Sequence, residues 1–275
     1  MTHGAGAFSF GERDLEQIRR TTFVQTVEHH REIESTNTRA TRWAEDPALA
    51  LPALVLSDVQ TGGRGRGTNR WWSAPGALTF SLILPRINSS DEPSWLRISL
   101  TAGLAVYDAL QQLRPGLQIG LKWPNDVFVQ RRKICGILAE TSPRAPARLV
   151  LGIGLNVNNS LAAAPPAVAA TAISLVDAVG YRFDLSVVLT HVLRQLAEQL
   201  AALARADTAL ASRWQELCML TGHRVQVDAG QRVTVGLCQG IDESGALLVD
   251  TPAGRELCRS GVVTTRGQEE SAHRA

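Results

Sequence analysis

The residues best suited to chemistry begin with a loop rich in glycine and arginine, residues 61–69, which follows an apolar run at 53–59. Glycines let a backbone approach a ligand closely with free N–H groups, and Arg64 and Arg66 add fork-shaped donors for phosphate or carboxylate oxygens. The glycine spacing fits neither a Walker loop nor the dinucleotide fingerprint. This glycine–arginine loop therefore predicts an anion-binding site of another kind, and the competing interpretation is a flexible surface tract.

A second group of residues contains the two lysines of the chain. Of 28 basic residues, only Lys122 and Lys133 are lysines. Lys122 opens the sequence KWPND, in which Asn125 and Asp126 suit a turn between two strands, and Lys133 lies on the returning strand. A carboxylate between two ammonium groups is useful where a metal-bound polyphosphate is attacked, because it can hold Mg²⁺ while a lysine neutralises phosphoryl charge. The alternative is an ordinary hairpin with surface charges.

A third group is GIGLNVN at residues 152–158, where a strand ends in two glycines and two asparagines. Such a strand end allows close backbone approach and offers amide donors and acceptors to a sugar or a base. On its own this pattern is weakly specific.

The elements around these groups predict an α+β fold, with a mixed or antiparallel sheet flanked by helices. Hydroxyl and amide groups at 35–37 predict a helix start. Beyond residue 221, regularly spaced turns separate five short strand-like runs, which indicates a small C-terminal β-barrel of SH3 type. The predicted strands are 23–28, 53–59, 77–84, 118–122, 127–129, 133–140 and 148–157, and the predicted helices are 14–20, 35–44, 93–113, 184–203 and 208–217.

The chain is accordingly divided into a tail with a short helix (1–22), a large domain (23–220), the barrel (221–268) and a final tail (269–275). Hydrophobic residues make up 44% and the formal net charge is +2, which excludes a disordered chain and gives no reason to expect a nucleic-acid-binding protein. Four widely spaced cysteines without a CxxC pair argue against zinc and for a reducing compartment. With no signal peptide and no membrane span in the sequence, we expect a cytoplasmic protein.

Four motifs together resemble one family. QTGGRGRGTNRWWS at 60–73, KWPND at 122–126, KICGILAE at 133–140 and GIGLNVNN at 152–159 occur in the order and spacing of biotin protein ligases. GIDESGALL at 240–248 looks like the C-terminal SH3-like domain of that family. The resemblance covers residues 23–266. Only a short tail precedes it, so we expect the monofunctional type without an N-terminal DNA-binding domain.

The resemblance implies a class II synthetase-like catalytic domain and a two-step reaction. Biotin attacks Mg-ATP to give biotinyl-5′-AMP and pyrophosphate, and biotin then passes to a lysine of a biotin carboxyl carrier protein of acetyl-CoA carboxylase or a related enzyme. It also implies no DNA and no membrane as partners. Family members occur as monomers and dimers, which leaves a homodimer open.

The resemblance also implies roles for individual residues. The catalytic group is Lys133, Arg66 and Asp126, with Asp126 also the Mg²⁺ ligand. The biotin-binding residues are Ser35, Thr36, Asn37, Gln60, Arg64, Gly65, Arg66 and Lys133. The residues that bind ATP or the adenylate are Gly63, Arg64, Arg66, Trp71, Lys122, Asn125 and Asn156. One departure is Thr68-Asn69, where many bacterial members have Gly-Arg, so that a contact from this arginine is absent or supplied by Arg70.

Two other functions fit parts of the pattern. A lipoate- or octanoate-protein ligase or transferase of the related fold would bind an aliphatic chain and would not require the polar residues Gln60, Ser35 and Thr36. A non-catalytic regulator that binds biotin or its adenylate would not require Lys133 or Asp126.

Overall fold

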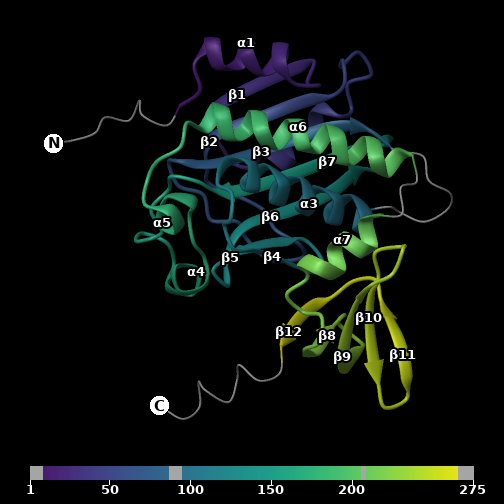
Figure 1. The fold of residues 1–275 in the computed structure, drawn as a ribbon. Coiled ribbons are helices and arrows are strands. Elements are labelled where there is room, and N and C mark those ends of the chain that lie inside the picture. Colours follow the sequence, from purple (N-terminus) through teal and green to yellow (C-terminus); the bar gives the residue numbers. More distant parts are fainter. Residues whose placement is uncertain (1–8, 87–94, 206–208, 266–275) are drawn as a thin grey trace.

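The structure, a computed structural model, describes residues 9–86, 95–205 and 209–265, and contains two sheets (Figure 1). The larger sheet has seven strands in the order β1-β2-β3-β7-β6-β5-β4. Only the pair β1–β2 is parallel, and the other pairs are antiparallel. The predicted mixed sheet is therefore confirmed. The strands are β1 (Thr26–Ile33), β2 (Ala53–Gln60), β3 (Ala77–Pro85), β4 (Ile119–Lys122), β5 (Asp126–Val129), β6 (Arg132–Ser142) and β7 (Ala145–Asn156).

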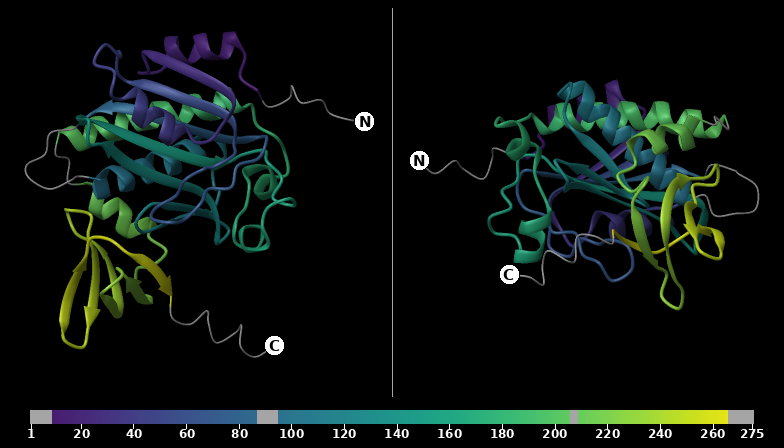
Figure 2. Two further views of the ribbon diagram at one scale, coloured as in Figure 1. Left: turned by 180° about the vertical axis from the view of Figure 1, so that it is seen from behind. Right: turned by 60° about the horizontal axis from the view of Figure 1, so that its bottom comes forward.

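Helices lie on both faces of this sheet (Figure 2). The helices α3 (Trp95–Leu113) and α6 (Leu185–Ala204) pack together on one face, and the short helix α2 (Thr36–Trp43) lies on the other. Side chains alternate between the faces of a strand, so Leu54 and Leu82 join the core under α3 while Val55 and Ile83 pack against α2. The sheet is thus buried on both sides, except where the functional cavity opens on the α2 face.

The C-terminal region forms the second sheet after α7 (Ala209–Leu217). All five predicted strands are present, and they pair antiparallel in the order β11-β10-β9-β8-β12. No ladder joins β11 to β12 within the described residues, so the expected SH3-like arrangement is an open sheet rather than a closed barrel. The strands are β8 (Arg224–Asp228), β9 (Val233–Ile241), β10 (Leu247–Thr251), β11 (Gly254–Cys258) and β12 (Val262–Thr265).

Specific contacts fix the second sheet against the first. The indole Nε1 of Trp123 donates to the carbonyl of Gly245 at 3.0 Å, and Trp123 is fully buried. Gly245 has φ +87°, and a Cβ there would lie 2.7 Å from Leu100 Cδ1 on α3. A larger residue at 245 would therefore be strained by the positive φ and would also displace the side chain of Leu100.

Some predicted bounds were wrong. The strand predicted at 23–28 is β1, Thr26–Ile33, because its parallel register with β2 extends to Ile33 and Gln60. An edge strand tolerates the charged residues that obscured its pattern. Two short helices were not predicted, α4 (Pro166–Thr171) and α5 (Leu175–Val179). The predicted N-terminal helix is α1 (Glu12–Thr21).

Some predictions fall outside the described residues, namely the helix starts at 93 and 208 and the tail at 269–275. In the part of the chain that is described, none of the helices combines the length and the apolar character needed to cross a bilayer.

Candidate active site

A cavity of about 350 Å³ opens on the α2 face of the large sheet. It brings together twelve of the fourteen residues singled out from the sequence, which come from α2, the glycine–arginine loop and strands β2, β5, β6 and β7. Gly63 and Lys122 do not line it. Those that do are Ser35, Thr36, Asn37, Gln60, Arg64, Gly65, Arg66, Trp71, Asn125, Asp126, Lys133 and Asn156.

One end of the cavity is an uncharged hydrogen-bond network. Ser35 caps α2, since its side chain accepts from Thr38 N at 3.4 Å. Gln60 Oε1 accepts from both the backbone N–H and the hydroxyl of Thr36, at 2.7 and 3.0 Å. Ser81 Oγ lies 2.8 Å from Thr36 Oγ1 and 2.6 Å from Asn37 Oδ1. These side chains are held in fixed positions by one another before any ligand arrives.

Asn37 continues this network to a charged pair. Its Nδ2 donates to Glu140 Oε2 at 2.9 Å, and the other carboxylate oxygen of Glu140 pairs with Arg64 Nη2. Arg64 therefore lines the cavity with its guanidinium bound to Glu140. Glu140 and Ser81 were missed in the sequence because each lies far along the chain from α2 and only the strand pairing brings it close.

Glycines form the floor of the cavity. Gly152 and Gly154 are two residues apart on β7 and so face the same side of the sheet. A Cβ on Gly152 would lie 1.9 Å from Asn37 Oδ1, and a Cβ on Gly154 would lie 2.4 Å from the indole of Trp71. The close approach predicted for this strand is thus realised by Asn37 and Trp71, and any side chain at either glycine would displace them.

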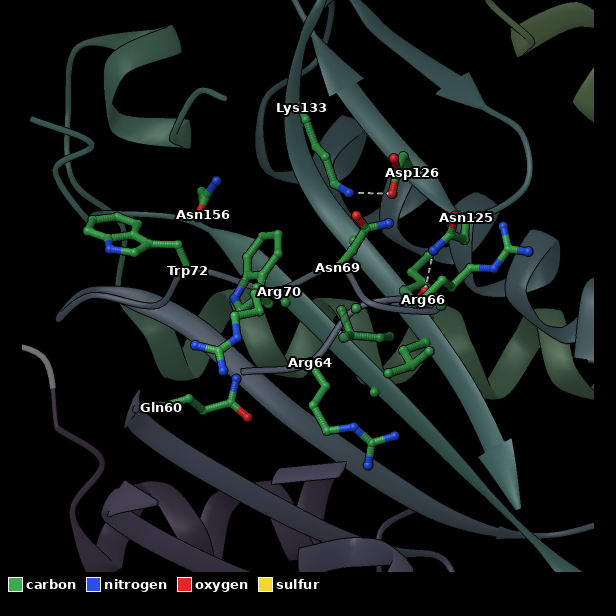
Figure 3. A pocket seen from close by; sticks show the side chains of 18 of the residues that line it. Gln60, Arg64, Arg66, Asn69, Arg70, Trp72, Asn125, Asp126, Lys133 and Asn156 are labelled. Atoms are coloured by element: carbon green, nitrogen blue, oxygen red, sulfur yellow. Dashed lines mark hydrogen bonds and ion pairs between the residues drawn. The ribbon is translucent and has the colours of Figure 1, made fainter. Parts of the chain in front are cut away.

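The opposite end of the cavity is charged (Figure 3). Lys133 Nζ lies 2.6 Å from Asp126 Oδ1, so the ammonium and the buried carboxylate oxygen form a close ion pair. Asn125 fixes the turn beside them, because its Nδ2 donates to Ile137 O at 2.6 Å and its carbonyl accepts from Ile137 N. The hairpin predicted from KWPND therefore does place Asp126 against Lys133.

Arg66 completes the charged end. Its Nη1 donates to the carbonyl of Gly261 at 3.4 Å, which links the glycine–arginine loop to the C-terminal sheet. Burial lowers the pKa of the Arg66 guanidinium and the nearby Asp126 opposes this, but an arginine stays protonated at any ordinary pH. Arg66 and Asn125 also line a second cavity of about 380 Å³, which reaches Arg259 and Ser260 of the C-terminal region.

Two predicted nucleotide-binding residues lie outside the cavity. The ammonium of Lys122 lies 5.7 Å from the ring centroid of Phe128. Burial lowers the pKa of Lys122, with a smaller lowering from Lys133 and an opposing effect of Asp126. Gly63 supports the loop instead, because its carbonyl accepts from Trp71 N and a Cβ would lie 2.5 Å from Trp71 O.

Another part of the cavity wall is formed by Asn156 and by residues that were not predicted from the sequence. Asn156 is buried and its Oδ1 accepts from Asn159 Nδ2 at 3.0 Å. Trp72 lies near it in Figure 3. The segment leading to α4 and α4 itself add a mainly apolar wall. The alanine-rich sequence with two prolines gave no reason to predict that this segment lines the cavity. The missed residues are Trp72, Leu161, Val168, Thr171 and Ala172.

Thr68-Asn69, where many members of the family have Gly-Arg, still contributes a polar side chain to the cavity. Asn69 and Arg70 both line it, so an amide and a guanidinium occupy the positions next to the glycine–arginine loop. In Figure 3 the side chain of Asn69 lies near Lys133 and Asp126, whereas Arg70 lies toward Gln60.

Comparisons with known proteins identify the family to which the chain is related. Residues 30–158 match the Biotin/lipoate A/B protein ligase family, and residues 221–264 match the Biotin protein ligase C terminal domain. A biotin--[acetyl-CoA-carboxylase] ligase of Mycobacterium tuberculosis is 33% identical over 76% of this chain and 77% of its own length. A relative of the same name from Paracoccus denitrificans is 32% identical over 82% of this chain and 94% of its own length.

The fold is shared with a solved structure of biotin protein ligase from Aquifex aeolicus in complex with biotin and ATP. That structure has a TM-score of 0.76 and 28% identity, and it covers 88% of this chain and 99% of the other. Fold and site thus define a member of the biotin/lipoate protein ligases. Within that class, the chain belongs to the biotin protein ligase family.

Proposed function

We propose that this chain is an ATP-dependent ligase that activates biotin to biotinyl-5′-AMP and transfers biotin to a lysine of a biotin carboxyl carrier protein. The observation that carries the proposal is one cavity with an uncharged hydrogen-bonding end and a cationic end. The first suits a neutral group with several polar atoms, and the second suits a carboxylate and a polyphosphate.

The uncharged end supports biotin over a purely aliphatic acid. The ureido ring of biotin carries two N–H donors and one carbonyl acceptor, which need matched partners when buried. Ser35, Thr36, Asn37 and Gln60 supply hydroxyl and amide groups around one space. A site of this type rejects a ligand that lacks those groups, because its buried polar atoms would lose their partners. Beyond the carboxylate, octanoate has only an aliphatic chain and lipoate an aliphatic chain that ends in a dithiolane ring, so neither carries the N–H and C=O groups of the ureido ring.

The charged end supports the adenylation step. A carboxylate oxygen of biotin attacks the α-phosphorus of ATP, a new P–O bond forms, and the bond to pyrophosphate breaks. Lys133 and Arg66 stabilise the negative charge that gathers on the phosphoryl oxygens. The second cavity adjoins at Arg66 and Asn125, which gives the departing pyrophosphate a way out past two arginines, Arg66 and Arg259.

Asp126 fits a role in holding Mg²⁺. Its Oδ1 is buried and is paired with the Lys133 ammonium, and Mg²⁺ in nucleotide sites is usually bound through one or two carboxylates together with phosphates. No cluster of three or more metal-binding side chains exists among the described residues, as expected if ATP supplies most ligands. When bound, the ion would neutralise phosphate charge. Lys133, now paired with Asp126, would then be released toward the substrate.

The second step needs the intermediate to be kept from water. The ε-amine of the acceptor lysine attacks the acyl carbon, AMP leaves with the bridging oxygen, and an amide forms as the amine loses a proton. The glycine–arginine loop lies over the cavity with Gly65, Arg66 and Asn69 in its lining, so it would exclude water from the mixed anhydride.

We place the domain boundary near residue 220, between α7 and β8, and the protein in the cytoplasm. The boundary is supported by the separate hydrogen-bonded sheets on its two sides.

The cytoplasmic location is supported by the four cysteines, which are all free and buried.

The experiment that tests the proposal is ATP–pyrophosphate exchange in the presence of Mg²⁺, with biotin, lipoate and octanoate as parallel substrates. We expect exchange with biotin and its loss when EDTA removes the metal. Exchange with lipoate or octanoate but not with biotin would refute the assignment of biotin as the substrate. If folded protein shows no exchange with any of the three acids, the assignment as an adenylating enzyme is refuted. Incubation with an isolated carrier domain, followed by mass spectrometry, then tests the acceptor.

A further inference from the structure

The glycine–arginine loop has a well-defined shape of its own. Gly65 N donates to Asn69 O at 2.9 Å, Asn69 N donates to Arg66 O at 3.1 Å, and Trp71 N donates to Gly63 O at 3.0 Å. These hydrogen bonds lie within residues 63–71, so they keep the shape of the loop without attaching it to the rest of the molecule. The base of the loop is attached at the end of β1, because Thr61 N donates to Ile33 O at 3.0 Å and Gly62 N donates to Glu34 O at 2.8 Å. The position of residues 63–69 over the cavity depends on further contacts.

Two arginine side chains, two residues apart in the loop, supply such contacts to different parts of the molecule. Arg66 reaches the carbonyl of Gly261 in the C-terminal region, and Arg64 pairs with Glu140 on β6. Figure 3 shows Arg64 extending away from Lys133 and Asp126. Its second nitrogen, Nη1, lies 3.4 Å from the hydroxyl of Thr38 on α2. The geometry of Arg64 is therefore that of an anchor.

Glu140 connects this anchor to the biotin end of the cavity. One carboxylate oxygen pairs with Arg64, and the other accepts from Asn37 Nδ2 at 2.9 Å. Because that amide nitrogen is occupied, the orientation of Asn37 is fixed, with Oδ1 directed to Ser81. The Glu140 side chain is only about one-quarter exposed, at 26%, so its charge is partly shielded from water.

We propose that Glu140 is a positioning residue that holds the glycine–arginine loop closed over the acyl-adenylate through Arg64, and that holds Asn37 in its binding orientation. This inference rests on the proposed function. Glu140 itself does not line the cavity, so it acts through the two residues that it binds. A charged anchor that is partly open to water can release the loop at a modest energetic cost, as each turnover requires.

Two substitutions separate the two contacts. Glu140→Gln keeps an oxygen that accepts from Asn37 but removes the charge that holds Arg64, so the loop should open more often. We expect release of biotinyl-AMP to rise about fivefold, while the KM for biotin changes less than about twofold. Glu140→Ala removes both contacts, and it should raise the KM for biotin as well as the release rate.

The measurement is a single turnover with labelled biotin and Mg-ATP, followed by rapid filtration to time the release of biotinyl-AMP. A double variant tests the pair directly. If Glu140 acts through Arg64, Arg64→Met with Glu140→Gln should release the adenylate no faster than the faster single variant. Additive effects, or wild-type release in Glu140→Gln, would overturn the assignment.

A matched control is the ion pair of Asp108 and Arg213, which joins α3 to α7. Its N–O distance is 2.6 Å, and neither residue lines the cavity. Asp108→Asn should leave release unchanged, and thermal unfolding of every variant reports folding. If wild-type protein forms no biotinyl-AMP, the proposed function fails and this assignment fails with it. If the wild type forms and retains biotinyl-AMP and Glu140→Gln retains it equally well, only the role of Glu140 is refuted.

Discussion

The uncharged and the charged ends of the cavity differ in how their polar groups are occupied. At the uncharged end, Gln60, Thr36 and Asn37 already hydrogen-bond to one another or to Glu140. At the charged end, Lys133 and Asp126 form an ion pair with each other on the cavity lining. Neutral ligands gain from partners fixed in advance, whereas a polyphosphate brings enough charge to rearrange a weakly held pair.

This difference predicts where substitutions act on the reaction. Changes at the charged end should lower the rate of adenylation, because the charge that they stabilise develops in the transition state. Changes at the uncharged end should raise the KM for biotin and leave the rate nearly intact.

The largest effect is expected for Lys133→Met. It removes a positive charge from the reacting phosphoryl group, and the loss of one such group typically costs about 2–4 kcal/mol of transition-state stabilisation. The exchange rate kcat should therefore fall by roughly 30- to 1000-fold, with folding intact. An unaltered adenylation rate in the variant would show that Lys133 does not stabilise the transition state.

A loss of intermediate is expected for Arg66→Gly. Without the contact to Gly261 and the charge on the phosphate, biotinyl-AMP should escape about tenfold faster, which follows from the strength of charge-assisted hydrogen bonds. Escaped adenylate should label exposed lysines of an added bystander protein. Arg66→Lys, which keeps the charge, should leak less. If the glycine variant does not leak, Arg66 only positions the loop.

A smaller effect is expected for Thr36→Val, which removes one of two donors to Gln60. Loss of one neutral hydrogen bond costs about 1 kcal/mol, so the KM for biotin should rise roughly fivefold with little change in kcat. Thr101→Val is the matched control, because Thr101 is a buried threonine on α3 whose hydroxyl has no partner. Equal KM values in the two variants would contradict the binding role of Thr36.

The smallest effect is expected for Lys122→Met, although Lys122 flanks Asp126 just as Lys133 does. Its side chain lies outside the cavity, so the exchange rate should stay within about twofold of wild type. Burial lowers the pKa of Lys122 in the folded protein, so its charged form opposes folding at pH values below that pKa. This cost disappears as the pH rises toward the ordinary lysine pKa. Denaturant unfolding at pH 7 should therefore show no loss of stability in the variant.

The sequence by itself determined the motifs, their order and most of the elements. Local chemistry explains this, because glycine spacing, the X-Pro turn and strand alternation all act over a few residues. The hairpin around Asn125 and Asp126 and the capped helix after Ser35 followed directly. Elements with ambiguous composition were missed, above all α4, whose alanine and proline content fixes neither its start nor its role.

Only the tertiary structure decided which side chains share the cavity. Lys122 and Lys133 are equivalent in the sequence, and in the ladders Lys122 stands opposite Asp126 while Lys133 stands opposite Phe128. The side chains nevertheless make the other contacts: Lys122 lies over Phe128, and Lys133 reaches Asp126 beside the register shift at Val127 and Phe128. The sequence predicted that Arg64 donates to a phosphate, but in the structure its guanidinium pairs with Glu140, which lies 76 residues further along the chain. Long-range strand pairing sets these distances, and no local pattern encodes them, because a single-residue shift in register moves a side chain to the opposite face of the sheet.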